Sequence, residues 1–151
     1  MDSARRYLVD TNILLRVSQQ GDSRYELIGA ALKRLGDQQS QLCFTLQNVA
    51  EFWNVCTRPV ERNGYGLSPA EANLRVEYVE RTMTYLPDNE RVYSIWRTLV
   101  IAHNVHGVQV HDAHLAAVML AHGIARILTL NPADFVRYSD LRAVHPSQVL
   151  E

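Results

Sequence analysis

Short apolar segments alternate with longer helical patterns along this chain of 151 residues, and this alternation is the feature that most restricts its fold. The segments predicted to be strands are Arg6–Val9, Leu42–Thr45, Thr84–Leu86, Arg126–Leu130 and Leu141–Val144. Strands that are joined by helical connections pair in parallel, and a parallel sheet is buried on both faces. The sequence therefore predicts the α/β class, with a central parallel sheet covered by helices on both sides.

The helices expected between these strands cover residues 12–18, 25–35, 46–58, 68–83, 88–106 and 111–122. Local signals mark their ends. Ser68 and Asp88 are expected to cap the helices that they precede, while Gly36 and Gly123 are expected to stop the helices that they follow. Gly107 is expected to break the helical pattern that precedes it.

Composition limits the class of protein. With 47% hydrophobic and 21% charged residues, the chain is expected to form a single domain over residues 1–151. The net charge of −1 is not that of a protein that coats nucleic acid non-specifically. No apolar run is long enough for a membrane span, and the N-terminus lacks the apolar centre of a signal peptide. Cys43 and Cys56 are predicted to be buried free thiols, and a reducing cytoplasm is the expected location.

Three carboxylates, Asp10, Glu51 and Asp112, each stand alone in an apolar segment. Asp10 directly follows the first strand, Glu51 lies about one turn into the helix after the second, and Asp112 is at the head of a later helix. A lone buried carboxylate is costly unless something compensates its charge. Each has a separate explanation: a helix cap for Asp10, a helix dipole for Asp112 and a buried arginine partner for Glu51. Because all three are expected at one edge of the sheet, we favour a shared site.

A shared site of this kind predicts a metal ion. Converging carboxylates repel one another, which raises their pKa values unless a cation is present. A set of hard oxygen ligands without cysteine favours Mg²⁺ or Mn²⁺.

Four segments of the chain, LVDTNILLR, NVAEFWNV, VHDAHLAAVMLAHG and ILTLNPADF, resemble in order and spacing the motifs of PIN-domain nucleases. The likeness is greatest to the VapC-type toxins of bacterial toxin–antitoxin pairs. The resemblance implies a three-layer α/β/α sandwich with a central parallel sheet, and cleavage of RNA that depends on Mg²⁺ or Mn²⁺. It also implies a homodimer and a small antitoxin protein that blocks the acidic cleft.

The resemblance assigns roles to particular residues. By position, Asp10, Glu51 and Asp112 match the first three acidic metal ligands of the family. Asn131 stands where many members have a fourth aspartate, and its amide oxygen can ligate a metal but brings no charge. Asp134, three residues later, is the expected substitute, either as a direct ligand or through a water molecule.

Thr11 and Asn12 resemble the polar residues that follow the first aspartate in the family. Asn12 is expected to orient a carboxylate or a water molecule, although helix capping explains it almost as well, and Thr129 is a weaker candidate for contact with the metal ligands. The metal ligands predict the mechanism, in which a hard cation polarises the phosphoryl oxygen and activates a water for in-line attack. One tightly bound ion is expected, with a second only when substrate phosphate adds ligands. No general base stands out, and the candidates are Glu51 and the activated water itself.

Two other interpretations remain open. His103, His106, His111 and His114 surround Asp112 in the sequence, which raises the possibility of a zinc site or of an HD-type phosphohydrolase acting on small nucleotides. Their spacing matches no zinc motif, and HD phosphohydrolases are all-helical, which leaves no place for the strand before Asp10. The other interpretation is a catalytically weak PIN-like module that binds RNA or a protein, and its basis is Asn131.

Overall fold

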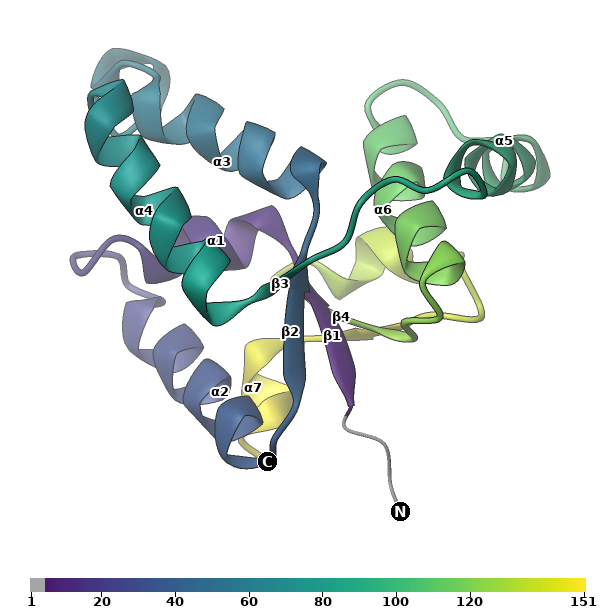
Figure 1. Ribbon diagram of the computed structural model, residues 1–151, viewed down its shortest axis with the longest axis horizontal. Coiled ribbons are helices and arrows are strands. Elements are labelled where there is room, and N and C mark those ends of the chain that lie inside the picture. The colour runs from purple at the N-terminus through teal and green to yellow at the C-terminus, as the bar shows by residue number, and fades with distance from the viewer. Residues whose placement is uncertain (1–4) are drawn as a thin grey trace.

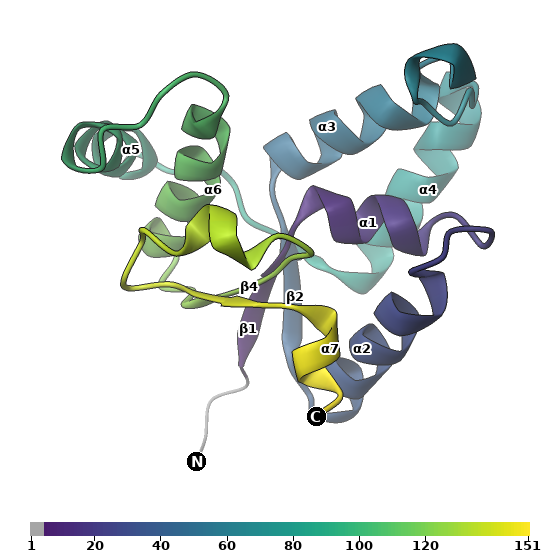
Figure 2. The ribbon, with the colours of Figure 1, turned by 180° about the vertical axis from the view of Figure 1, so that it is seen from behind.

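The computed structural model describes residues 5–151 and contains a five-stranded sheet with helices on both sides (Figures 1 and 2). Its strands are β1 (Arg6–Val9), β2 (Gln41–Phe44), β3 (Thr84–Tyr85), β4 (Arg126–Leu128) and β5 (Arg142–Val144). They lie in the order β3-β2-β1-β4-β5, and every neighbouring pair is parallel. The predicted α/β class with a central parallel sheet is confirmed.

The sheet is built outward from β1 in both directions. The chain passes from β1 to β2 and β3 on one side, then crosses back to place β4 against the other side of β1. Leu8 of β1 is aligned with Cys43 of β2 and with Ile127 of β4. In open parallel sheets, ligands bind beyond the carboxyl ends of the strands where the order reverses in this way. The reversal here lies between β1 and β4, directly before Asp10.

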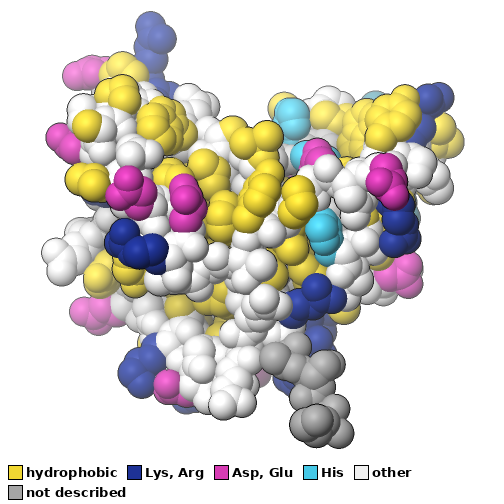
Figure 3. Space-filling model, viewed as in Figure 1, with side chains coloured by type: hydrophobic (Ala, Val, Ile, Leu, Met, Phe, Trp, Pro, Cys, Tyr) yellow, Lys and Arg dark blue, Asp and Glu magenta, His cyan; other side chains and the backbone are white. Residues whose placement is uncertain are grey.

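Alternating side chains of the central strand enter two separate cores. Tyr7 and Val9 belong to one core and Leu8 to the other, as the period of two in a strand requires. The first core is covered by α1 (Thr11–Val17), α2 (Tyr25–Asp37), α3 (Leu46–Thr57), α4 (Pro69–Thr82) and α7 (Pro146–Val149). The second is covered by α5 (Val92–Ala102) and α6 (Gln109–Ala121). The three-layer sandwich is therefore confirmed, and a space-filling view shows a notch between the two helical layers (Figure 3).

Two of the predicted helix signals are confirmed. The Ser68 hydroxyl accepts a hydrogen bond from the backbone N–H of Glu71 at 3.1 Å, which caps α4. Gly123 adopts φ of +70° just after α6, a conformation that glycine takes without strain. The Gly36 prediction is wrong, because α2 continues through this residue to Asp37.

The helix predicted over residues 88–106 is shorter at both ends. It begins at Val92 and ends at Ala102, because Asn104 already has φ of +50° ahead of Gly107. Asp88 does not cap it, because the Asp88 carboxylate lies 2.9 Å from the ring of His114.

Three strands, β2, β3 and β4, end earlier than predicted. Thr45 becomes the N-cap of α3, and the backbone N–H of Leu130 donates to the side chain of Asn12 at 3.3 Å, which takes both residues out of the sheet. Sequence periodicity also missed three short helices, α7, η1 (Val60–Arg62) and η2 (Pro132–Phe135). Each is too short to show a helical period.

Both cysteines are buried and free, as predicted. Within residues 5–151, no helix has the length and apolar character needed to cross a lipid bilayer. Part of the prediction that the chain starts without a signal peptide concerns residues 1–4, which lie outside the described residues.

Candidate active site

Asp10 joins the end of the central strand to the start of α1. Its Oδ1 accepts a hydrogen bond of 2.8 Å from the backbone N–H of Thr11, and its Oδ2 accepts one of 2.8 Å from the Thr129 hydroxyl. Its own backbone N–H donates to the carbonyl of Leu128 at 3.0 Å, which ties it to the end of β4. Asp10 is the N-cap of α1, so the capping explanation holds. The capping role is compatible with a role in the candidate site, because Oδ2 is bound by Thr129, the residue that follows β4.

Glu51 lies beside Asp10 through a shared partner. The hydroxyl of Thr11 donates to Glu51 Oε2 at 2.9 Å, and the backbone N–H of the same threonine binds Asp10. Thr11 is buried, with 6% of its surface exposed. The other oxygen, Glu51 Oε1, accepts from the amide nitrogen of Gln47, one turn earlier in α3, at 2.7 Å. Both carboxylates are thus held by neutral donors, and Thr11 binds both of them.

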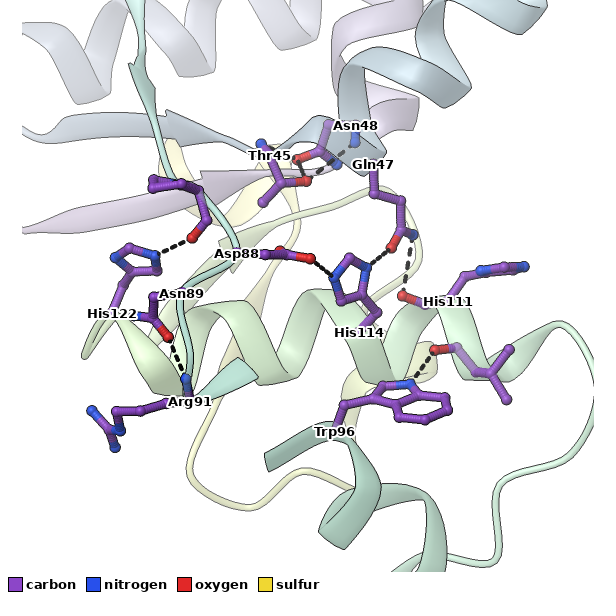
Figure 4. A network of polar contacts seen from close by, with 12 residues as sticks. Thr45, Gln47, Asn48, Asp88, Asn89, Arg91, Trp96, His111, His114 and His122 are labelled. Carbon is purple, nitrogen blue, oxygen red and sulfur yellow. Dashed lines mark hydrogen bonds and ion pairs between the residues drawn. The ribbon is translucent and has the colours of Figure 1, made fainter. Parts of the chain in front are cut away.

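Two buried polar residues, Thr45 and Asn48, hold Thr11 in place. Asn48 Nδ2 donates to the Thr11 hydroxyl at 3.1 Å, while Asn48 Oδ1 accepts from both the backbone N–H and the hydroxyl of Thr45 at 2.9 Å (Figure 4). Both residues are fully buried. The sequence analysis missed them, although a threonine followed three residues later by an amide, just after a strand, is close to a capping-box pattern.

Asp112 reaches the site from the opposite helical layer. It is half-buried in the first turn of α6. Burial and the negative charges of Asp134, Asp10 and Glu51 raise the pKa of Asp112 to about 6, and His111 offsets this only in part. Hydrogen bonds through Thr11 connect Asp10 with Glu51, and Gln47 connects Glu51 with the backbone carbonyl beside Asp112. Asp112 and Asp134, an exposed residue of η2, line one small cavity. The structure therefore places the three predicted acids and Asp134 in one region.

Burial also raises the pKa of Asp10. The hydrogen bonds from Thr129 and Thr11 favour the ionised carboxylate and oppose this effect, while the charges of Glu51 and Asp134 add to it. The charges of both Glu51 and Asp134 thus act on Asp10.

The remaining predicted residues divide into two groups. Thr129 is fully buried and contacts Asp10, and Asn12 lies next to it, with Asn12 Nδ2 3.5 Å from the Thr129 hydroxyl. Asn131 is exposed, and its contact to this group comes from its backbone N–H, which donates to the Thr129 hydroxyl at 3.1 Å. The charge of Asp134, by contrast, reaches both Asp10 and Asp112.

The chemistry of this cluster fits a hard divalent cation. All four acids offer oxygen ligands, and none takes part in a salt bridge within residues 5–151. Each oxygen of Asp10 and Glu51 accepts one hydrogen bond, which leaves a second lone pair for a metal. In the part of the chain that the structure describes, no three Asp, Glu, His or Cys side chains form a ready-made metal site. The four acidic side chains would therefore have to move closer together to bind a single ion.

The structure does not support the histidine-based interpretations. The ring of His103 packs edge-on against Tyr138, with 5.1 Å between ring centroids, while His114 contacts Gln47 and Asp88. These histidines thus have separate partners, and residues 5–151 contain no histidine-based metal cluster. The parallel sheet also contradicts the all-helical architecture of HD phosphohydrolases.

Comparisons with known proteins agree with this fold. The model of the PIN domain family matches residues 7–141. Similar solved structures include VapBC-1 from nontypeable Haemophilus influenzae, at 16% identity and TM-score 0.70, covering 94% of this chain and 98% of that one. A toxin–antitoxin complex from Klebsiella pneumoniae has 18% identity and TM-score 0.63, covering 93% and 97%. Mycobacterium tuberculosis VapC20, a toxin that cleaves the sarcin–ricin loop, has 19% identity and TM-score 0.59, covering 80% and 86%. No curated protein sequence matches.

The raised pKa of Asp112 predicts how stability depends on pH in metal-free protein. Because the pKa rises from 3.8 to about 6 in the folded chain, folding favours the protonated acid, and this contribution is lost as the pH rises through about 6. Asp112→Asn, which cannot ionise, should therefore be more stable than the unmodified protein above about pH 6, by about 1 kcal/mol after solvent screening. The advantage should disappear near about pH 4. Thermal unfolding across this range tests it, with the exposed Asp140→Asn as control. A pH-independent difference would contradict it.

Proposed function

The chain belongs to the PIN domain family, and from this premise we propose that it is an endoribonuclease that hydrolyses RNA phosphodiesters with the help of Mg²⁺ or Mn²⁺. We further propose that it is the toxin of a toxin–antitoxin pair. The observation that carries the nuclease proposal is the group of Asp10, Glu51, Asp112 and Asp134 near the carboxyl end of β1, none of which forms a salt bridge within residues 5–151. Such a group attracts a divalent cation, and the cation in turn attracts a phosphate.

In the proposed site, some residues would bind the cation and others would position those ligands. Asp10, Glu51 and Asp112 would hold the cation, with Asp134 contributing its charge directly or through water. When bound, such a cation supplies polarisation of the phosphoryl oxygen and lowers the pKa of a water molecule. Thr11 and Thr129 hold the carboxylates by hydrogen bonds of 2.8 to 2.9 Å, so little reorganisation is needed when the substrate arrives.

The position of Asn131 bears on whether the site is active. A catalytically weak module remains the second candidate, because an amide replaces the fourth acid that many family members have. The charge of Asp134 raises the pKa of both Asp10 and Asp112, so the cluster already contains a fourth negative charge. This supports a working site in which Asp134 takes the place left by Asn131.

An apolar groove between α2 and α4 supports the proposal that the chain binds a small protein. Its volume is about 970 Å³, and Leu74 and Tyr78, one turn apart on α4, expose 64% and 62% of their surfaces beside it. Lys33, Arg75 and Arg81 outnumber Glu26 among its charged lining residues. We therefore propose that the antitoxin places an amphipathic segment with flanking acidic residues in this groove. The homodimer and the cytoplasmic location expected from the sequence stay predictions.

Substitution of Asp10 tests the nuclease proposal. Asp10→Asn keeps the shape of the side chain but removes a central negative charge, so cleavage of single-stranded RNA should fall about 100-fold or more. Chelation should abolish cleavage by the unmodified protein, and added Mg²⁺ or Mn²⁺ should restore it. The exposed Asp140→Asn serves as the matched control. Full activity of Asp10→Asn would rule out this site. Product ends with a 5′-phosphate would agree with attack by water, whereas a 2′,3′-cyclic phosphate would not.

A pair of variants separates a working site from a degenerate one. If Asp134 supplies the fourth charge, Asp134→Asn should lower cleavage roughly tenfold and Asn131→Asp should change it by less than about threefold. Initial rates on one RNA substrate with saturating Mn²⁺ provide the measurement. A large gain in Asn131→Asp, starting from near-zero activity, would instead identify a binding module.

Binding at the groove can be tested by charge. Leu74→Glu places a carboxylate in the apolar groove. It should therefore weaken, about tenfold or more, the complex with the antitoxin, for which the candidate is the product of a short reading frame next to this one. Cleavage by the free protein should not change. Ile101→Glu, at a residue that is 67% exposed on α5, is the control. Equal affinity of both variants would place the partner elsewhere.

A further inference from the structure

Glu51 and Asp112 come from helices on opposite faces of the sheet, so their separation is not set by either helix alone. Helix α3 packs into one core through Phe52 and Cys56, whereas α6 packs into the other core. The two carboxylates carry like charges that repel each other. A link between the helices is therefore needed to hold both acids at one site.

Gln47 makes this link from α3. Its Nε2 donates to Glu51 Oε1 at 2.7 Å and to the backbone carbonyl of His111 in α6 at 3.1 Å (Figure 4). Because its amide nitrogen faces two acceptors, the orientation of the amide is fixed, and Oε1 must face the other way. One side chain thus touches a site carboxylate and the opposite helical layer at the same time.

His114 completes the link from α6. Its Nδ1 lies 2.6 Å from Gln47 Oε1 and donates to it, while its Nε2 lies 2.9 Å from the carboxylate of Asp88, in the loop between β3 and α5 (Figure 4). Within residues 5–151, the contacts of Gln47 with His111 and His114 are the direct hydrogen bonds between α3 and α6. Both Gln47 and His114 are half-buried, and the bond between them is partly shielded from water, which strengthens it relative to surface contacts.

We propose that Gln47 and His114 are positioning residues, forming a latch that holds α3 against α6 and so sets the place of Glu51 relative to Asp112. This inference rests on the proposed function, in which these two acids belong to one metal site. Asp88 contributes little to the latch, because its side chain is 54% exposed and exposed ion pairs are weak. The latch explains why a glutamine and a histidine, neither of them an expected ligand, lie between the two helices.

The first test measures metal affinity. Titration calorimetry with Mn²⁺ and RNA-free protein should show about tenfold weaker binding for Gln47→Ala and for His114→Ala. Gln41→Ala and His122→Ala are matched controls, since these side chains bind Thr84 and Pro87 outside the cluster, and both should stay within about twofold. In cleavage assays, saturating Mn²⁺ should restore most of the rate of the latch variants, because the ligands themselves remain. Equal Mn²⁺ affinity in all variants would overturn the proposal.

The second test needs neither metal nor activity. Nitroxide labels at Asn54→Cys in α3 and Val108→Cys at the start of α6 report the separation of the helices, since both positions are exposed. Burial raises the pKa of the native Cys43 and Cys56 thiols, which keeps them from reacting with the label.

Gln47→Ala should broaden the distance distribution between the labels, and Gln41→Ala should not. An unchanged distribution in Gln47→Ala would overturn the latch. If the unmodified protein neither bound Mn²⁺ nor cleaved RNA, the proposed function would fail, and the distance measurement would still decide the role of Gln47.

Discussion

The burial of acidic side chains beside one another near the end of β1 is the constraint on which the candidate site depends. Burial and the neighbouring charges raise the pKa of Asp112 and Asp10, so the folded chain carries a cost at neutral pH. Hydrogen bonds from Thr129 and from the backbone of Thr11 lower this cost at Asp10, and the side chains of Thr11 and Gln47 hold Glu51. A lysine or arginine would stabilise the acids more strongly but would cancel their charge. Neutral donors orient the acids and leave the negative charge available for a cation.

The parallel sheet explains why these acids meet at all. The carboxyl ends of β1, β2 and β4 face the same edge, and each is followed by a residue of the polar network: Asp10, Thr45 or Thr129. Because β1 sits at the reversal in strand order, the following segments depart to different sides of the sheet. Glu51 thus approaches from one helical layer and Asp112 from the other, since α3 and α6 pack into different cores. A site built in this way depends on how the two layers are held together.

The parts of the fold that the sequence predicted well are those with a local cause. The three central strands and most helices follow from periodicity, and the caps at Ser68 and Gly123 follow from the chemistry of single residues. The prediction failed where a distant contact competes with a local preference. Asp88 looks like a helix cap, yet its carboxylate pairs with His114, and the helix starts at Val92. Sequence alone contains no sign of that competition.

By itself, the sequence determined the parallel α/β architecture and singled out three acids, Asp10, Glu51 and Asp112, as candidates for one site. It did so because an isolated charge in an apolar segment has a cost that is visible locally. Only the tertiary structure decided that Thr45, Asn48, Gln47 and His114 support these acids, because neutral polar residues carry no such cost until a partner is known. Asp134 differs, because the sequence already predicted it as the substitute for Asn131. The structure adds that its charge acts on Asp10 and Asp112, which are far from it in the chain. The hydrogen bond between Asp10 and Thr129 spans 119 residues, and folding alone brings them together.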